Sequence, residues 1–364
     1  MSEPAGDGAE RVLRTVGQDA PAPHRVVYRW DLDKTYLRTE FDTLRDLLRT
    51  AFESPRRKRT VPGAAALLRE LGATGPASVF VLSGSPESMR RALEAKLRLD
   101  GVQWDEFVLK PSLRRLLQGD FRFLKDQLGY KLGALLRARA GLEPGVQEVL
   151  FGDDAEQDAF VYSLYAEICA GRMGTEELAR VLRAAHLDEE RHLPELLELA
   201  ATVPRAEAVR RIFIHLDRLS VPTRFEPFGT RLCAFFNYFQ PAAVLVEEGL
   251  LPAASALRVG LELVEHDGFS AHALAASLQD LVERGQLGRP GVVALHDGLE
   301  AFGTSERRLF GRALRALGEA LRSLRQRAPE VVRVTVPEVD FVRLYESEQQ
   351  RWRAAKARVR AARG

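Results

Sequence analysis

Three short runs of apolar residues dominate the hydrophobic pattern of the first half of the chain. They cover Val26–Tyr28, Ser78–Leu82 and Glu148–Phe151. Short runs of this kind are typical of buried strands in parallel sheets. Strand and helix patterns alternate over residues 24–170, which favours a parallel sheet with right-handed crossovers. We therefore predict an α/β fold in which helices flank a parallel sheet.

The remainder of the chain is predicted to be mostly helical. Residues 1–23 are rich in Gly, Pro, Ala and acids, which indicates a flexible N-terminal arm. Apolar spacing at about 171–210 predicts a helical insertion, after which Ile212–His215 returns to the sheet. Helical periodicity then dominates residues 251–364, with one isolated strand at Val331–Val336.

Each of the three strand-like runs is followed by polar residues that can carry chemistry. The first leads into Arg29-Trp30-Asp31-Leu32-Asp33-Lys34-Thr35, the second into Ser83-Gly84-Ser85-Pro86, and the third into Gly152-Asp153-Asp154-Ala155-Glu156-Gln157-Asp158. In open α/β sheets, ligands bind at the carboxyl ends of the strands. Two carboxylates two residues apart can therefore act at one site, although an Asp-rich turn that merely caps a strand is the alternative.

Strand then acid, strand then serine, a lysine on a helix at Lys131, and strand then acid resemble the ordered four-motif signature of the haloacid dehalogenase superfamily. The resemblance implies a Rossmannoid sheet. Residues Tyr36 to Arg59 have the spacing of mostly one helix, which leaves no room for a large lid between the first two motifs, so we expect a minimal cap. The resemblance also implies that Asp31 attacks phosphorus to form an aspartyl-phosphate, and that Asp33 protonates the leaving oxygen and then activates water. Ser83, with Gly84, would bind the phosphoryl oxygens, and Lys131 would bring positive charge beside Asp31.

The same resemblance implies a metal site. Asp31 and Asp153, with the carbonyl of Asp33, would hold Mg²⁺, a hard cation that prefers oxygen ligands. Asp158 or Asp154 would position the waters of the metal. An acid at position 33 fits the hydrolysis of phosphate esters, because the leaving alkoxide must be protonated.

A closer resemblance, over residues 24–250, is to the catalytic domain of the actin-patch-type phosphatidate phosphatases. It is carried by Ser83-Gly84-Ser85-Pro86, Tyr130-Lys131 and Gly152-Asp153-x-x-Glu156-x-Asp158-x-x-x-Tyr162. Lys34, Asp154 and Ala159 depart from the family pattern, and none of these departures removes a catalytic group. The resemblance implies hydrolysis of phosphatidic acid to diacylglycerol. A protein or soluble-metabolite phosphatase and a non-catalytic binding module on this fold are the alternatives.

The composition agrees with a cytoplasmic enzyme that binds no nucleic acid. The formal charge is +2, from 53 Lys and Arg against 51 Asp and Glu, so there is no whole-protein attraction to a polyanion. The two cysteines, Cys169 and Cys233, have apolar neighbours, as is typical of buried thiols in a reducing compartment. No run of 18 apolar residues occurs, and the first residues have no apolar signal segment.

Two basic segments raise the expectation of peripheral contact with an anionic membrane. One is Arg56-Arg57-Lys58-Arg59, and the other is the terminal run Arg351–Arg363, which contains no acids. Solvated basic segments are the alternative interpretation of both. The expected partner is thus a phosphorylated substrate, with a lipid phosphate as one candidate.

Overall fold

A computed structural model of the chain describes residues 10–16, 26–37, 59–74, 77–110, 127–187, 193–217, 220–300 and 302–351. Its centre is a six-stranded parallel sheet in the order β4-β3-β2-β5-β6-β7. The strands are β2 (Val26–Asp31), β3 (Ala77–Pro86), β4 (Glu106–Lys110), β5 (Gln147–Asp153), β6 (Val209–His215) and β7 (Leu232–Phe235). The predicted α/β fold with a parallel sheet is confirmed.

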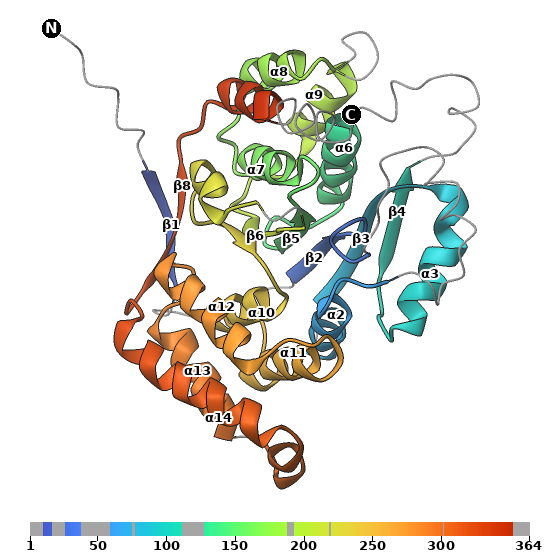
Figure 1. Ribbon diagram of the computed structural model, residues 1–364. Coiled ribbons are helices and arrows are strands. Elements are labelled where there is room, and N and C mark those ends of the chain that lie inside the picture. Colours follow the sequence, from blue (N-terminus) through green and yellow to red (C-terminus); the bar gives the residue numbers. More distant parts are fainter. Residues whose placement is uncertain are drawn as a thin grey trace, which may run out of the picture.

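Helices cover both faces of this sheet (Figure 1). One face carries α6 (Gln127–Ala140), α7 (Asp158–Cys169), α8 (Thr175–Ala184) and α9 (Leu193–Thr202). The other carries α2 (Ala64–Ala73), α3 (Arg90–Leu99), α10 (Phe239–Glu247), α11 (Ala253–His266), α12 (Ala271–Glu283), α13 (Arg289–Glu300) and α14 (Thr304–Arg327). Two short 3₁₀ segments, η2 (Glu87–Met89) and η3 (Pro222–Phe228), are also present. Residues 341–351 are helical and pack on the α7 side of the core. Burial on both faces explains the near-continuous apolar runs of the central strands.

Alternate residues of each central strand enter different halves of the core. In β5, Val149 and Phe151 join the cluster on the α10 side, whereas Leu150 joins the cluster on the α7 side. The rings of Trp30 and Phe151 stack at 3.9 Å across β2 and β5. This packing fixes the height at which the two strands end, and therefore where Asp31 and Asp153 lie.

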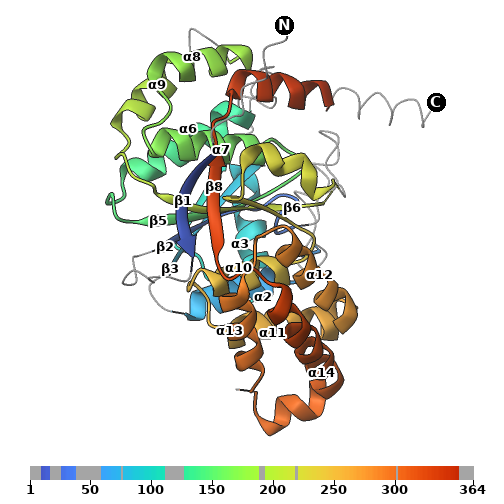
Figure 2. The same ribbon diagram turned by 90° about the vertical axis from the view of Figure 1, so that its left-hand side faces the viewer.

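Residues 10–16 overturn part of the expected flexible arm, because they form strand β1 (Glu10–Val16). β1 pairs antiparallel with β8 (Val332–Pro337), the strand expected to be isolated (Figure 2). A lone strand leaves its N–H and C=O groups unpaired, and the β1 segment supplies the missing partner. The two-stranded sheet of β1 and β8 contacts the segment just before β7, since the amide of Arg231 donates to the carbonyl of Thr335 in β8 at 3.1 Å.

The insertion predicted at 171–210 is helical in its described part. α9 packs on α6, and α8 packs on α9, so both extend the helical layer over one face of the sheet. No helix in the described ranges is long and apolar enough to cross a bilayer. The loop with Arg56–Lys58 and the tail beyond Arg351 lie outside the described residues, as does the segment expected to limit the cap, 38–58.

Candidate active site

Three adjacent strands bring the predicted residues to one edge of the sheet. Asp31 ends β2, Ser83 lies near the end of β3, and Asp153 ends β5, while β2 runs between the other two. Lys131 reaches this edge from α6, and Asp158 is the first residue of α7. All five residues are buried, with at most 1% of their surface exposed. The structure therefore collects residues that are far apart in the sequence.

Lys131 is the cationic centre of the site. Its Nζ lies 3.0 Å from Asp31 Oδ1 and 2.8 Å from Glu156 Oε2, and it also pairs with Asp158 Oδ1. Burial alone would lower the pKa of Lys131, but the carboxylates of Asp158, Asp31 and Glu156 raise it well above its usual value. The ammonium therefore stays charged at physiological pH and can attract an anionic phosphoryl group.

Asp33 is held by two serine hydroxyls. Ser83 Oγ and Ser85 Oγ donate to Asp33 Oδ2 at 2.9 and 3.0 Å, and the Ser85 amide donates to Ser83 Oγ at 3.0 Å. Burial raises the pKa of Asp33, the nearby Glu156 raises it further, and the two serine hydrogen bonds partly oppose the shift. The net effect is a raised pKa, which shifts Asp33 toward its protonated form relative to an exposed aspartate.

Asp31 and Asp153 carry the two buried oxygens that fit a cation. Asp31 Oδ1, which faces the Lys131 ammonium, and Asp153 Oδ2 accept no hydrogen bond from the described residues. The other oxygen of each is used: Thr35 Oγ1 donates to Asp31 Oδ2, and two amides after β5 donate to Asp153 Oδ1. Asp31 Oδ1 is balanced by the ion pair with Lys131, whereas Asp153 Oδ2 is left without a donor among the described residues, and a buried carboxylate oxygen in that state favours a positive ligand.

The oxygens of Asp31, Asp153 and Asp158 lie within 4.8 Å of one another. Burial raises the pKa of each, and their mutual repulsion adds to the rise for Asp31 and Asp153, while Lys131 opposes it. With Asp33 and Glu156 nearby, five carboxyl groups lie around the Lys131 ammonium, and Lys34 adds a weaker attraction at Asp153. An all-oxygen, carboxylate-rich set of this kind suits a hard divalent cation, so the residues present fit such a metal.

Gly152 is required at the end of β5 by the close approach of α7. A Cβ at this position would lie 2.5 Å from Asp158 Oδ2 and 2.6 Å from Asp158 Cβ. The free space lets Asp158 Oδ2 accept the amide of Asp153 at 3.1 Å while its Oδ1 pairs with Lys131. Asp158 is therefore fixed by one amide and one cation.

Two contributors were not singled out as site residues from the sequence. Glu156 completes the set of carboxylates around Lys131, and Ser85 provides the second hydroxyl to Asp33. Both residues lie inside the sequence motifs quoted above, and this position could have identified them as site residues. Gly84 and Asp154 lie in the same two loops: a Cβ at Gly84 would meet open space, and Asp154 Oδ2 accepts the amide of Ser220 at 3.2 Å.

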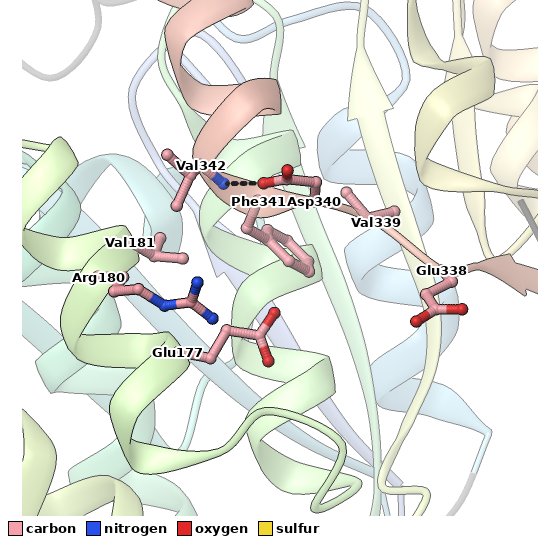
Figure 3. A pocket seen from close by; sticks show the side chains of 8 residues that line it. All are labelled: Glu177, Arg180, Val181, Glu338, Val339, Asp340, Phe341 and Val342. Atoms are coloured by element: carbon pink, nitrogen blue, oxygen red, sulfur yellow. Dashed lines mark hydrogen bonds between the residues drawn. The ribbon is translucent and has the colours of Figure 1, made fainter. Parts of the chain in front are cut away.

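The described structure also contains a cavity of about 380 Å³ between α8 and residues 338–342, and none of the site residues lines it (Figure 3). Its charged groups are three acids, Glu177, Glu338 and Asp340, against one cation, Arg180. Asp340 is already engaged, because its Oδ1 accepts the amide of Val342 at the start of the next helical segment. An acid-rich lining of this kind does not suit a phosphate ester.

Comparison with protein families agrees with the chemistry at the sheet edge. Residues 30–174 match the family model described as "Phosphatidate phosphatase APP1, catalytic domain". The matched range is less than half of the chain, and it contains all four motifs. Searches of curated proteins and of solved structures gave no match. The family match confirms the resemblance expected from the motifs, and with the α/β fold it supports a phosphatase, that is, a hydrolase of phosphate esters.

Proposed function

We propose that this chain is a Mg²⁺-dependent phosphomonoester hydrolase of the haloacid dehalogenase type that works through an aspartyl-phosphate on Asp31. The observation that carries the proposal is the meeting of Asp31, Asp33, Ser83, Lys131 and Asp153 at one sheet edge. The family match over residues 30–174 supports the same reaction class. The chain is proposed to act in the cytoplasm, with peripheral contact to anionic membranes.

In the first half-reaction, a carboxylate oxygen of Asp31 forms a bond to phosphorus as the ester P–O bond breaks. The electron pair of that bond leaves with the alkoxide, which takes the proton from Asp33. Lys131 neutralises and orients the phosphoryl oxygens, which gather negative charge in the transition state. Ser83 acts through Asp33, because its hydroxyl has one proton to donate and donates it there. The raised pKa of Asp33 serves this role, because the acid must be protonated when the substrate arrives.

In the second half-reaction, Asp33 is a carboxylate and takes a proton from a water molecule, whose oxygen bonds to phosphorus. The bond between phosphorus and Asp31 then breaks, which releases inorganic phosphate and restores the Asp31 carboxylate. Asp33 ends protonated, as it began. The two serine hydroxyls on its Oδ2 keep Asp33 in one orientation for both transfers.

Asp31 and Asp153, with the Asp33 carbonyl, would hold the Mg²⁺, and Asp158 would orient its waters. The cation would supply positive charge that offsets the carboxylates and keeps Asp31 ionised. This charge is needed because burial raises the pKa of Asp31 and Lys131 is shared with two other acids.

Among substrates, we propose phosphatidic acid, with diacylglycerol as the product. The family match supports a lipid phosphate, and so do two exposed apolar side chains at the catalytic edge. Val221 follows β6 with 64% of its surface exposed, and Phe236 directly follows β7 with 43% exposed. Apolar groups beside a phosphoryl site can contact acyl chains.

The test is a phosphate-release screen with Mg²⁺ over lipid, nucleotide, sugar and peptide phosphates, run in parallel on the Asp31→Asn variant. We expect the highest kcat/KM on phosphatidic acid in mixed micelles and no turnover by the variant. Turnover of peptide or soluble phosphates alone would replace the lipid assignment. Undiminished turnover by Asp31→Asn would contradict the mechanism.

A further inference from the structure

The turn that carries the paired aspartates uses most of its own backbone groups. Within residues 31–37, the carbonyl of Leu32 accepts the amides of Tyr36 and Leu37, at 3.0 and 2.8 Å. The carbonyl of Tyr36 accepts the amide of Val61 at 2.7 Å. The turn is thereby closed on itself and tied to the start of the next segment.

Two carbonyls of this turn are satisfied by side chains from the far half of the chain. His215 Nδ1 lies 3.1 Å from the carbonyl oxygen of Lys34, and the Tyr238 hydroxyl donates to the carbonyl of Thr35. A carbonyl can only accept, so His215 carries its proton on Nδ1. Residues more than 180 positions away therefore hold the loop between the catalytic aspartates and Leu37.

The turn needs such support because its backbone is strained. Lys34 has φ +60°, in the left-handed region of backbone conformation that residues other than Gly, Asn and Asp rarely adopt. Strained backbone of this kind persists only where surrounding contacts determine it. Lys34 directly follows Asp33, so relaxation of this residue would move the carboxyl group that Ser83 and Ser85 orient.

The supporting side chains are themselves buried and stacked on other rings. The ring of His215, 8% exposed, stacks on Tyr238 at 5.8 Å and 26° between planes. Tyr238 in turn stacks on Trp30 of β2 at 5.6 Å and 17°. His215 also ends β6, directly opposite Asp153 in the ladder, so its backbone is fixed to the same sheet edge.

We propose that His215 is a positioning residue for the phosphatase reaction: its Nδ1–H holds the left-handed turn at Lys34 and thereby the orientation of Asp33. The inference rests on the proposed function, and it assigns to His215 no proton transfer and no contact with substrate. A purely packing role predicts something different, because a side chain of similar volume would then suffice.

Two amide variants separate the alternatives. The Nδ2 of an asparagine takes the place of histidine Nδ1, whereas the Nε2 of a glutamine takes the place of histidine Nε2. We expect His215→Asn to keep kcat within about threefold, and His215→Gln and His215→Leu to lower it about 10–100-fold, since a misplacement of about 1 Å costs up to ~10²-fold. KM for p-nitrophenyl phosphate with Mg²⁺ should change little. The control is His266→Leu, because His266 is 64% exposed at the end of α11.

A second-site variant tests the strain directly. Glycine adopts positive φ freely, so Lys34→Gly in the His215→Leu background should recover a large part of the lost kcat. Equal kcat for the Asn, Gln and Leu variants, or no recovery by Lys34→Gly, would overturn the inference.

Amide hydrogen exchange gives a readout that does not depend on turnover. His215→Leu should lose protection at the amides of Lys34, Tyr36 and Leu37, and His215→Asn should retain it. A wild-type chain without phosphatase activity would refute the proposed function, and the exchange pattern would still decide whether His215 holds the turn. Unchanged protection in His215→Leu would refute that role.

Discussion

Gly152→Ala perturbs the site through one methyl group and leaves every polar residue in place. The added Cβ would lie 2.5 Å from Asp158 Oδ2 and 2.6 Å from Asp158 Cβ. Favourable carbon contacts begin at about 3.5 Å, so roughly 1 Å of separation is missing. The nearest carbon is Asp158 Cβ, next to the backbone at the start of α7, so a side-chain rotation cannot relieve the clash. The helix must move.

We expect this change to lower the free energy of unfolding by about 1–3 kcal/mol, the usual cost of overpacking. A shift of Asp158 by about 1 Å should lower kcat roughly 10²-fold, because Asp158 would lose the Asp153 amide and its pairing with Lys131. Denaturant unfolding and phosphate release measure the two effects.

Gly72→Ala is the matched control for this substitution. Gly72 lies within α2, and a Cβ there meets nothing within 4 Å. Alanine in a helix is favoured over glycine by about 0.5–1 kcal/mol, so this variant should be fully active and no less stable. Wild-type stability and kcat in Gly152→Ala would refute the reasoning about Asp158.

Four further predictions address the charges of the site and its two exposed apolar side chains. Lys131→Met should lower kcat by about 10²–10³, as the loss of a donor to a developing anion does, and wild-type kcat would contradict the assignment. Asp153→Asn keeps the oxygen that accepts the Ala155 amide but removes a buried charge, so in chelator this variant should be more stable than wild type. Its melting temperature should not rise with Mg²⁺. A rise equal to that of wild type would exclude Asp153 as a metal ligand. Burial raises the pKa of Asp31 and Asp153 in the folded state, which therefore binds more protons than the unfolded state above about pH 4. In chelator the free energy of unfolding should therefore fall as the pH rises above this value, while the stabilisation by Mg²⁺ grows. Thermal melts between pH 5 and 8 would show both trends. Val221→Ser with Phe236→Ser should lower turnover of micellar phosphatidic acid and spare p-nitrophenyl phosphate, and equal loss on both substrates would remove the lipid argument.

The residues at the carboxyl edge of the sheet could be predicted from the sequence, because their motifs directly follow strongly apolar strands. In a parallel sheet all strands end on the same side, so Asp31, Ser83 and Asp153 had to share an edge once the strands were recognised. Lys131 could be assigned only through the resemblance, since nothing local distinguishes a lysine on a helix from a solvated one. Its burial among three carboxylates is a tertiary property.

What the sequence did not reveal depends on contacts between distant segments. β1 lies within a Gly- and Pro-rich stretch whose composition indicates an arm, and it forms because β8 offers an unpaired edge more than 300 residues later. From the sequence, His215 is only a residue at the end of a strand. Its hydrogen bond to the Lys34 carbonyl depends on the order of the strands in the sheet, which the sequence does not give directly. The left-handed φ of Lys34 could not be predicted either, since lysine has no preference for this backbone conformation.

The aspartyl-phosphate on Asp31 is the central claim, and chemical trapping tests it most directly. Wild-type protein is mixed with phosphatidic acid micelles and Mg²⁺, quenched within the first turnover, and treated with borohydride, which reduces an acyl phosphate to an alcohol. Peptide mass spectrometry then reads the product. We predict homoserine at position 31 and nowhere else, dependent on substrate and absent without Mg²⁺. An unmodified Asp31 under conditions in which phosphate is released, or reduction at another carboxylate, would contradict the account.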